Sequence, residues 1–160
     1  MTTSVTSPGP NFESFPDPEY PGWFTWQLND PTRFNGQILG KMIVRLDPDG
    51  RARTRMFPER RHTNLADNLH GGTILSLIDV SLFSCSRMFG LIEAGTSVTL
   101  DLSVQFLGAG KGDKPLDAVA ELLKETRRLL FLRGSTSLVA PTSSSKSAGC
   151  GSRRWRSRSA

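Results

Sequence analysis

The chain has 160 residues, of which 37% are hydrophobic and 22% are charged. That length corresponds to about one domain, and the composition is that of a globular protein with enough apolar residues for a core. No apolar stretch approaches the roughly 20 residues that span a bilayer, and the N-terminus lacks a basic segment followed by an apolar one. We therefore expect a cytoplasmic enzyme or binding domain without membrane contacts. Cys85 and Cys150 lie far apart without metal-ligand spacing, so neither a disulfide framework nor a bound metal is expected.

The positive charge of the chain is confined to its C-terminal end. Of the 20 lysines and arginines, five lie in residues 141–160, which contain no acid, so the 15 that remain balance the 15 acidic residues of 1–140. A nucleic-acid-binding domain carries its basic charge on a folded face or helix, so no nucleic-acid partner is expected. Residues 141–160 are also rich in serine, which predicts a disordered tail.

The N-terminal segment is dominated by proline. Five of the ten prolines lie in residues 1–21, and proline sustains neither a helix nor a ladder of strands, so we predict a mobile lead. An apolar patch over residues 23–28 follows, and we predict a short helical turn on the domain surface there. The folded domain is then predicted over residues 22–140.

Alternating apolar residues predict a sheet. Residues 38–46 and 51–57 flank Asp47-Pro48-Asp49-Gly50, which has the residue types of a tight turn, so they form a predicted β-hairpin. Residues 97–107 place five apolar side chains at a period of two and predict a strand. Residues 129–140 predict another strand. Residues 116–125 have helical propensity but the length of a strand, so a helix and a strand both stay open for this segment.

One long helix is predicted over residues 72–91. It is apolar nearly all round, which is typical of a buried helix, and Asp79 and Arg87 are its only full charges before the break at Gly90. A single buried helix packed on an antiparallel sheet gives an α+β fold.

Residues 64–72, which lead into this helix, are the candidate site. Gly71 and Gly72 allow a ligand to approach the backbone closely, and the first turn of a helix presents N–H groups without partners. Such a place suits a developing oxyanion, although a loop that simply needs glycine has the same pattern. Asp79 lies among apolar residues, so its carboxylate requires a partner or a shifted pKa. A structural aspartate that caps a neighbouring loop is the alternative.

Helix geometry separates these two features within one chain. Gly71 and Asp79 are eight residues apart, which is about 12 Å at 1.5 Å per residue. A site that combines the start of the helix with Asp79 must therefore use two chains, and a two-fold dimer creates two such sites.

The pattern Asn64-(x5)-His70-Gly71-Gly72-(x6)-Asp79, followed by the strand from Thr99 to Leu107, resembles the hotdog-fold acyl-CoA thioesterases of the phenylacetate-degradation (PaaI) type. The resemblance covers residues 36–140. It implies a hotdog fold, in which an antiparallel sheet wraps around one long central helix. It also implies an acyl-CoA substrate, no cofactor apart from the coenzyme A of that substrate, and a homo-oligomer that is a dimer or a dimer of dimers.

The resemblance further implies roles for individual residues. Asp79 corresponds to the catalytic carboxylate, as general base or as nucleophile, and Gly71 to the glycine whose backbone N–H binds the thioester carbonyl from the other subunit. Asn64 and His70 correspond to residues that shape this pocket, and Thr99 to the residue that holds the attacking water. The coenzyme A site is implied at the strand edge formed by Thr126, Arg127, Arg128 and Leu129. Gly72 and Lys111 are further candidates for binding the substrate.

The residues themselves agree with this function but leave alternatives. Hydrolysis of a thioester needs an oxyanion hole and an activated water, and Arg127 and Arg128 have the guanidinium groups that suit phosphates. A solvated strand end is the alternative for these arginines. Lys111, in the preceding loop, could likewise meet a phosphate or simply be solvated. A non-catalytic protein that binds acyl groups or coenzyme A is the alternative for the whole chain. A hotdog dehydratase is disfavoured because the His-Phe-Pro-Gly pattern is missing.

Overall fold

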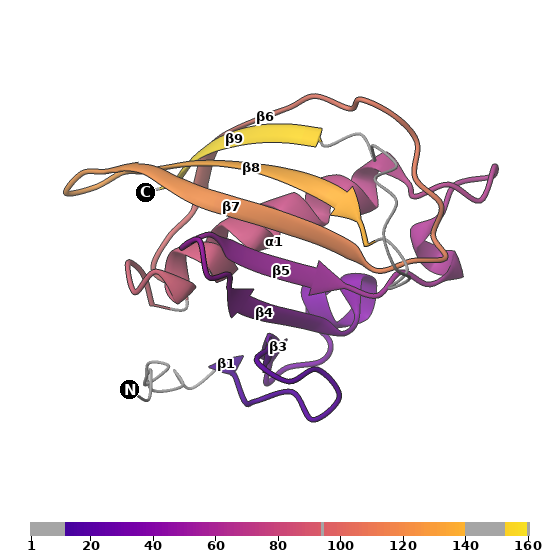
Figure 1. Cartoon of the computed structure of the whole chain (residues 1–160), viewed down its shortest axis with the longest axis horizontal. Helices are drawn as coiled ribbons and strands as arrows, with labels where there is room; N and C mark the ends of the chain where they lie inside the picture. The colour runs from indigo at the N-terminus through magenta and orange to yellow at the C-terminus, as the bar shows by residue number, and fades with distance from the viewer. Residues whose placement is uncertain (1–11, 94, 140–152, 160) are drawn as a thin grey trace.

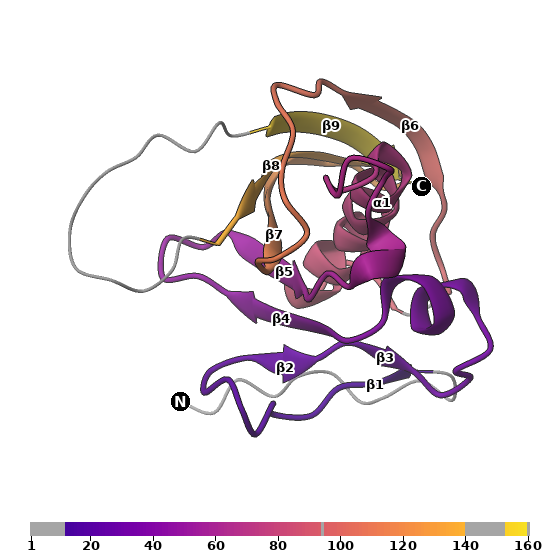
Figure 2. The same cartoon turned by 90° about the vertical axis from the view of Figure 1, so that its right-hand side faces the viewer.

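A curved antiparallel sheet wraps around one long helix, α1, as Figures 1 and 2 show for this computed structural model. The structure describes residues 12–93, 95–139 and 153–159. Helix α1 spans Gly71–Met88, and Gly90, with φ of +72°, follows its end. The predicted buried helix, the α+β class and the hotdog architecture are confirmed. No helix within the described ranges is long and apolar enough to cross a membrane.

Seven strands form the main sheet, in the spatial order β2-β4-β5-β7-β8-β9-β6. Their bounds are Phe24–Thr25 (β2), Met42–Leu46 (β4), Ala52–Met56 (β5), Leu116–Glu125 (β7), Leu130–Leu138 (β8), Arg153–Ser159 (β9) and Thr99–Val104 (β6). Two short strands, β1 (Phe12–Glu13) and β3 (Gln27–Leu28), pair separately, and two short helical turns span Asn35–Leu39 (η1) and Arg60–His62 (η2).

The local sequence explains the hairpin of β4 and β5. Gly50, with φ of +80°, donates its N–H to the Asp47 carbonyl at 2.9 Å, which closes the predicted turn. Strand β7 settles the assignment that the sequence left open. It lies between β5 and β8, and its first five residues are all buried, so strand pairing and packing override its helical propensity.

The N-terminal prediction is wrong for residues 12–21. Phe12 is only 1% exposed and packs against Trp26 with ring centroids 4.2 Å apart. The predicted helical turn at residues 23–28 is likewise wrong, because this segment forms β2 and β3. Buried aromatic rings hold the extended segment against the domain, so proline content did not decide its conformation. Residues 1–11 lie outside the described residues.

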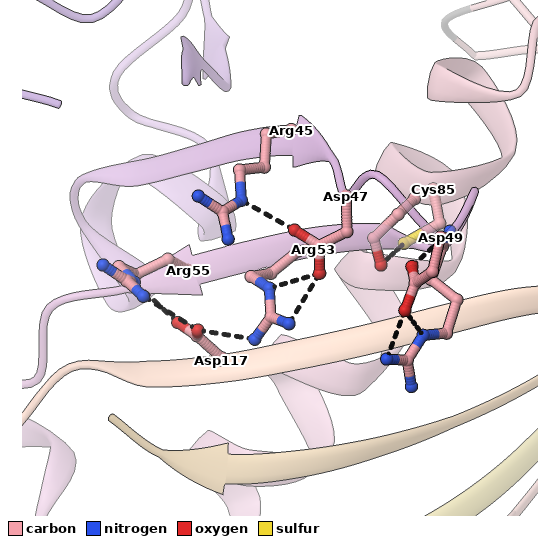
Figure 3. Close-up of polar contacts among 9 residues, drawn as sticks. Arg45, Asp47, Asp49, Arg53, Arg55, Cys85 and Asp117 are labelled. Carbon is pink, nitrogen blue, oxygen red and sulfur yellow. Dashed lines mark hydrogen bonds and ion pairs between the residues drawn. The ribbon is translucent and has the colours of Figure 1, made fainter. Parts of the chain in front are cut away.

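A cluster of charges covers the face of β4, β5 and β7 that points away from α1 (Figure 3). Asp47 accepts hydrogen bonds from Arg45 and Arg53, and Asp117 accepts them from Arg53 and Arg55. Trp23 is 4% exposed and lies between the guanidiniums of Arg45 and Arg55, each 4.5 Å from its ring. This cluster fastens the N-terminal segment to the outer face of the sheet.

The prediction of a disordered tail is wrong for residues 153–159. They form β9, which lies inside the sheet between β8 and β6, with Trp155 opposite Gly134 on one side and Val104 on the other. The serine and arginine content misled the prediction, because backbone hydrogen bonds on both edges stabilise a strand whatever its side chains are. Residues 140–152 and 160 lie outside the described residues.

Breaking the backbone ladder of β9 should destabilise the fold. Ser157 pairs with Leu132 on β8 and Leu102 on β6, so Ser157→Pro removes a ladder N–H in an inner strand. A missing hydrogen bond of this kind costs about 1–3 kcal/mol, and we expect a Tm lower by roughly 5 °C or more in a thermal melt. Ala109→Pro, in an exposed loop, is the control and should change Tm little. Equal melting of both variants would contradict a structural role of β9.

The acid stability of the fold should depend on Asp47. Burial acts to raise the pKa of this carboxyl, but the hydrogen bonds and charges of Arg53 and Arg45 outweigh it and lower the pKa below its ordinary value of 3.8. The stabilisation is then complete above pH 4 to 5 and is lost as the pH falls through the lowered pKa. Asp47→Asn should lower Tm at pH 7, since breaking a buried ion pair costs about 3 kcal/mol. This deficit should shrink in acid.

Asp49→Asn is the matched control on the same hairpin, because Asp49 pairs with Arg51 at the exposed surface. Exposed pairs contribute little to stability because water and salt screen them, so its Tm should stay near that of the unaltered protein. If the Tm of Asp47→Asn stays below that of the unaltered protein by the same amount from pH 7 to pH 3, ionisation of Asp47 does not contribute to the acid stability of the fold.

Candidate active site

Asp79 and Thr99 are brought into contact by the packing of β6 on α1. The Thr99 hydroxyl donates a hydrogen bond to Asp79 Oδ1 at 2.7 Å. Asp79 is half-buried, and its Oδ2 accepts no hydrogen bond from any residue in the described part of the chain. The carboxylate that the sequence places in an apolar helix therefore has one hydroxyl partner and one oxygen available to a ligand or water.

Two backbone N–H groups at the start of α1 differ in their hydrogen bonds: that of Gly72 has an acceptor, and that of Gly71 has none within the described residues. His70 caps the helix, and its Nδ1 accepts a hydrogen bond from the Gly72 N–H at 2.9 Å. The Gly71 N–H has no acceptor among residues 12–93, 95–139 and 153–159. A Cβ atom at Gly71 would lie 3.8 Å from Phe106, which is an ordinary contact. Thus the His70 side chain satisfies the Gly72 N–H, and the Gly71 N–H is left for a ligand.

His62, which the sequence analysis did not consider, positions this helix start. It is buried, its Nδ1 accepts from the Glu59 N–H at 2.7 Å and its Nε2 donates to the Ile38 carbonyl at 2.5 Å. Its own carbonyl accepts the N–H of His70 at 2.9 Å and the hydroxyl of Thr73 at 3.2 Å. A lone histidine in a polar sequence gave no sign of this role.

Asn64 and Lys111 lie near the same end of α1. Asn64 Oδ1 accepts hydrogen bonds from the N–H groups of Ala66 at 2.9 Å and Asn68 at 3.2 Å, so this side chain shapes its own loop. Lys111 Nζ donates to the Ala66 carbonyl at 3.2 Å. The loop borders an open cavity of about 760 Å³ that Asn64 and His70 line together.

The residues assigned to coenzyme A at 126–129 form the turn between β7 and β8. The Thr126 hydroxyl and backbone close this turn through hydrogen bonds with Leu129. Arg127 and Arg128 are exposed, and neither pairs with an acid of the described chain. All four residues of the turn line a cavity of about 380 Å³. Two unpaired guanidiniums beside a cavity have the charge that a phosphate requires.

A third cavity, of about 270 Å³, lies beside Asp79 and is lined largely by apolar side chains. It shares two lining residues, Ile92 and Ser97, with the cavity at the turn of residues 126–129. The two cavities are therefore neighbours.

Two other kinds of chemistry have little support in the described residues. No group of three or more potential metal ligands occurs among them. Burial raises the pKa of the Cys85 thiol to about 12, so Cys85 is not an activated nucleophile at neutral pH. Cys150 lies outside the described residues.

Within one chain the predicted site residues form separate groups. Both Gly71 and Asp79 lie on α1, so their separation of about 12 Å along the axis stands. The start of α1 collects Asn64, His70, Gly71, Gly72 and Lys111, whereas Asp79 and Thr99 lie further along the helix. Bringing the two groups together requires a second copy of the chain.

The fold and the spacing of these groups resemble those of the hotdog-fold thioesterases, and comparisons with known proteins find similar chains among the thioesterases. A sequence model described as the thioesterase superfamily matches residues 66–135. Human acyl-coenzyme A thioesterase 13 is 25% identical over 95 residues, which are 59% of this chain and 66% of that protein. The match thus spans slightly less than two thirds of the curated relative.

Solved structures share the fold. Zebrafish thioesterase superfamily member 2 has a TM-score of 0.61 at 24% identity and covers 81% of this chain and 86% of its own. The Escherichia coli PaaI protein from the phenylacetic acid degradation operon has a TM-score of 0.59 at 19% identity, covering 77% and 84%. The predicted resemblance to hotdog-fold thioesterases is confirmed.

Proposed function

We propose that the chain hydrolyses the thioester of an acyl-CoA to a free acid and coenzyme A. The observation that carries this proposal is the hydrogen bond from Thr99 to Asp79 beside an apolar cavity. Because the Thr99 hydroxyl donates to Asp79, its lone pairs can accept a hydrogen bond from a water molecule. Asp79 then takes a proton from that water as the general base.

The oxyanion of the tetrahedral intermediate requires a hydrogen-bond donor, and the Gly71 N–H of the same chain lies about 12 Å from Asp79 along α1. We assign this donor to the Gly71 N–H of a second subunit, which the helix dipole makes more effective. Attack of the water breaks the carbonyl π-bond, and collapse of the intermediate expels the thiolate of coenzyme A. His70 and Asn64 hold the loop that presents Gly71.

The edge strand β6 is the surface on which we place the second copy. It ends the seven-stranded sheet, so one edge of its backbone is unpaired within the described chain. The segment around it exposes large apolar side chains, which are Val98, Leu100, Phe106 and Leu107. Pairing two β6 strands about a two-fold axis joins the sheets, covers these side chains and creates two equivalent sites.

The coenzyme A moiety is assigned to the cavity at the turn between β7 and β8. Arg127 and Arg128 are placed there to meet its phosphates, and Thr126 and Leu129 line the same cavity. The cavity beside Asp79 is left for the acyl group. Lys111 and Gly72 lie at the start of α1, so any contact of theirs with coenzyme A would come from the partner subunit.

Replacing the carboxylate should abolish turnover without unfolding the protein. We expect Asp79→Asn to lower kcat by about 10²-fold or more, as is usual for a general base, while Tm stays close to normal. The measurement is release of free thiol from a panel of short, long and aromatic acyl-CoAs. Asp113→Asn, in an exposed loop, is the control.

Near-normal turnover by Asp79→Asn would refute the assignment of the base. If the unaltered protein hydrolyses none of the panel but melts at a higher temperature in its presence, the non-catalytic alternative is correct.

Removing the Gly71 donor should inactivate the enzyme as severely. Gly71 is the first residue of α1, where proline is tolerated, and the preceding His70 has φ of −65° and ψ of 138°, which suits a residue before proline. Gly71→Pro should therefore fold normally but lose about 10²–10³-fold in kcat. Gly71→Ala keeps the N–H and has space for its Cβ, so it should stay largely active.

Mixed subunits then test whether the site is shared. A hybrid of Gly71→Pro and Asp79→Asn chains has one intact site and one doubly altered site. With free exchange, half of the dimers are hybrids, so activity should return to about one quarter of normal. If subunit exchange is demonstrated and the mixture remains inactive, the site lies within one chain.

A further inference from the structure

The N-terminal segment forms part of the wall of the cavity beside Asp79. The apolar lining of this cavity comes from that segment, from α1 and from the loop that follows α1: Phe12, Trp26, Leu28, Val80, Phe83 and Ile92. The three residues of the N-terminal segment do not line the cavity assigned to coenzyme A. They therefore bound the space that the proposed function leaves for the acyl group.

Phe12 is held in this wall by contacts on several sides. It is 1% exposed, and its ring centroid lies 4.2 Å from that of Trp26. The guanidinium of Arg87 lies over the same ring at 4.7 Å. The backbone of Phe12 pairs with that of Leu28, opposite it on β3. A ring packed in this way moves aside only by breaking these contacts, so it forms a firm boundary of the cavity.

The contact with Arg87 also places Phe12 at a defined distance from the carboxylate. Asp79 and Arg87 both lie on α1 and line the cavity, with Phe83 midway between them. A spacing of four residues keeps these three side chains on one side of the helix. Eight residues correspond to about 12 Å along the helix axis. The ring of Phe12 therefore meets the helix about two turns beyond Asp79.

We propose that Phe12 limits the length of the acyl chain and that the preferred substrate has an unbranched acyl chain of about eight carbons. This inference rests on the proposed function, because it places the thioester carbonyl beside Asp79. With carbon–carbon bonds of about 1.5 Å, an extended chain of roughly eight carbons spans a distance of the order of the two helix turns.

The volume of the cavity leads to a similar length. A methylene group is close in size to a water molecule, which occupies about 30 Å³ in the liquid, so roughly nine such groups fill a cavity of about 270 Å³. The length along α1 and the volume of the cavity are separate observations, and both indicate a chain of medium length.

Shorter and longer chains should be disfavoured for different reasons. Each methylene group that the cavity buries strengthens binding by up to about fourfold, so a short chain binds more weakly. A longer chain must displace the Phe12 ring from its contacts or turn back toward solvent. The first costs packing and the second leaves methylene groups exposed.

The test compares kcat/KM for butanoyl-CoA, octanoyl-CoA and dodecanoyl-CoA, each kept below the concentration at which it forms micelles. We expect the unaltered protein to favour octanoyl-CoA over either of the others by about tenfold or more. Phe12→Leu should raise the ratio of dodecanoyl-CoA to octanoyl-CoA turnover by about fivefold or more, because it removes part of the boundary. Phe57→Leu is the matched control, since the Phe57 ring contacts Tyr20 of the same segment at 5.2 Å but does not line the cavity.

A second measurement does not depend on the variant folding. Thioethers of coenzyme A with octyl and dodecyl chains cannot be hydrolysed, and the octyl thioether should inhibit the unaltered protein at a concentration about tenfold lower. Apolar burial alone would favour the dodecyl chain, so this order identifies a limit on length.

The outcomes separate the inference from the function on which it rests. A kcat/KM that rises steadily to dodecanoyl-CoA, with stronger inhibition by the dodecyl thioether, would overturn the inference and leave the proposed function intact. Equal changes of the chain-length ratio in Phe12→Leu and Phe57→Leu would show that Phe12 acts only through the stability of the segment, which also overturns it. Absence of hydrolysis of all three thioesters and of the wider panel would refute the proposed function itself.

Discussion

Burial of one helix on nearly every side is the constraint on which the rest of the structure depends. The sheet surrounds α1 by curling (Figure 2), and the groups proposed to act in catalysis lie at two places along this helix. One is its N-terminal end, where Gly71 offers a donor, and another is Asp79, where the curled sheet brings Thr99 alongside. Because the rise per residue is fixed, these places cannot meet in one chain. Assembly is thus a geometric requirement of the proposed chemistry.

Strand β9 is important for the candidate site although its side chains give no sign of this. Strand β6 supplies Thr99, yet within the described chain it is joined to the sheet through β9. Without β9, β8 and β6 would each lose a backbone partner, and the position of Thr99 relative to Asp79 would no longer be fixed by the sheet. A segment of serines and arginines therefore has a direct structural connection to the candidate active site.

The elements that could be predicted from the sequence are those whose pattern of apolar side chains or turn residues matches the structure they form. The hairpin around Gly50, the apolar helix and the alternating strand of β6 all have this property. Residues 12–21 and β9 do not, because tertiary contacts decide their conformation: Phe12 is held by Trp26 and Arg87, and β9 by two neighbouring strands. In the site, Asp79 and Gly71 stood out by residue type. Thr99 came from the resemblance alone, and His62 acquires its role only from packing.

The N-terminal segment links the outer and inner sides of the sheet. On the outer side, Trp23 lies between Arg45 and Arg55, and further along, Trp26 and Phe12 enter the cavity that contains Arg87. The aromatic rings that fasten this segment thus also close one wall of the proposed acyl pocket. A hotdog domain can in this way change its substrate range through the residues before its first long strand, while Asp79, Thr99 and Gly71 remain in place. The space proposed for the acyl group is then bounded in part by a segment of the chain that takes no part in the proposed hydrolysis.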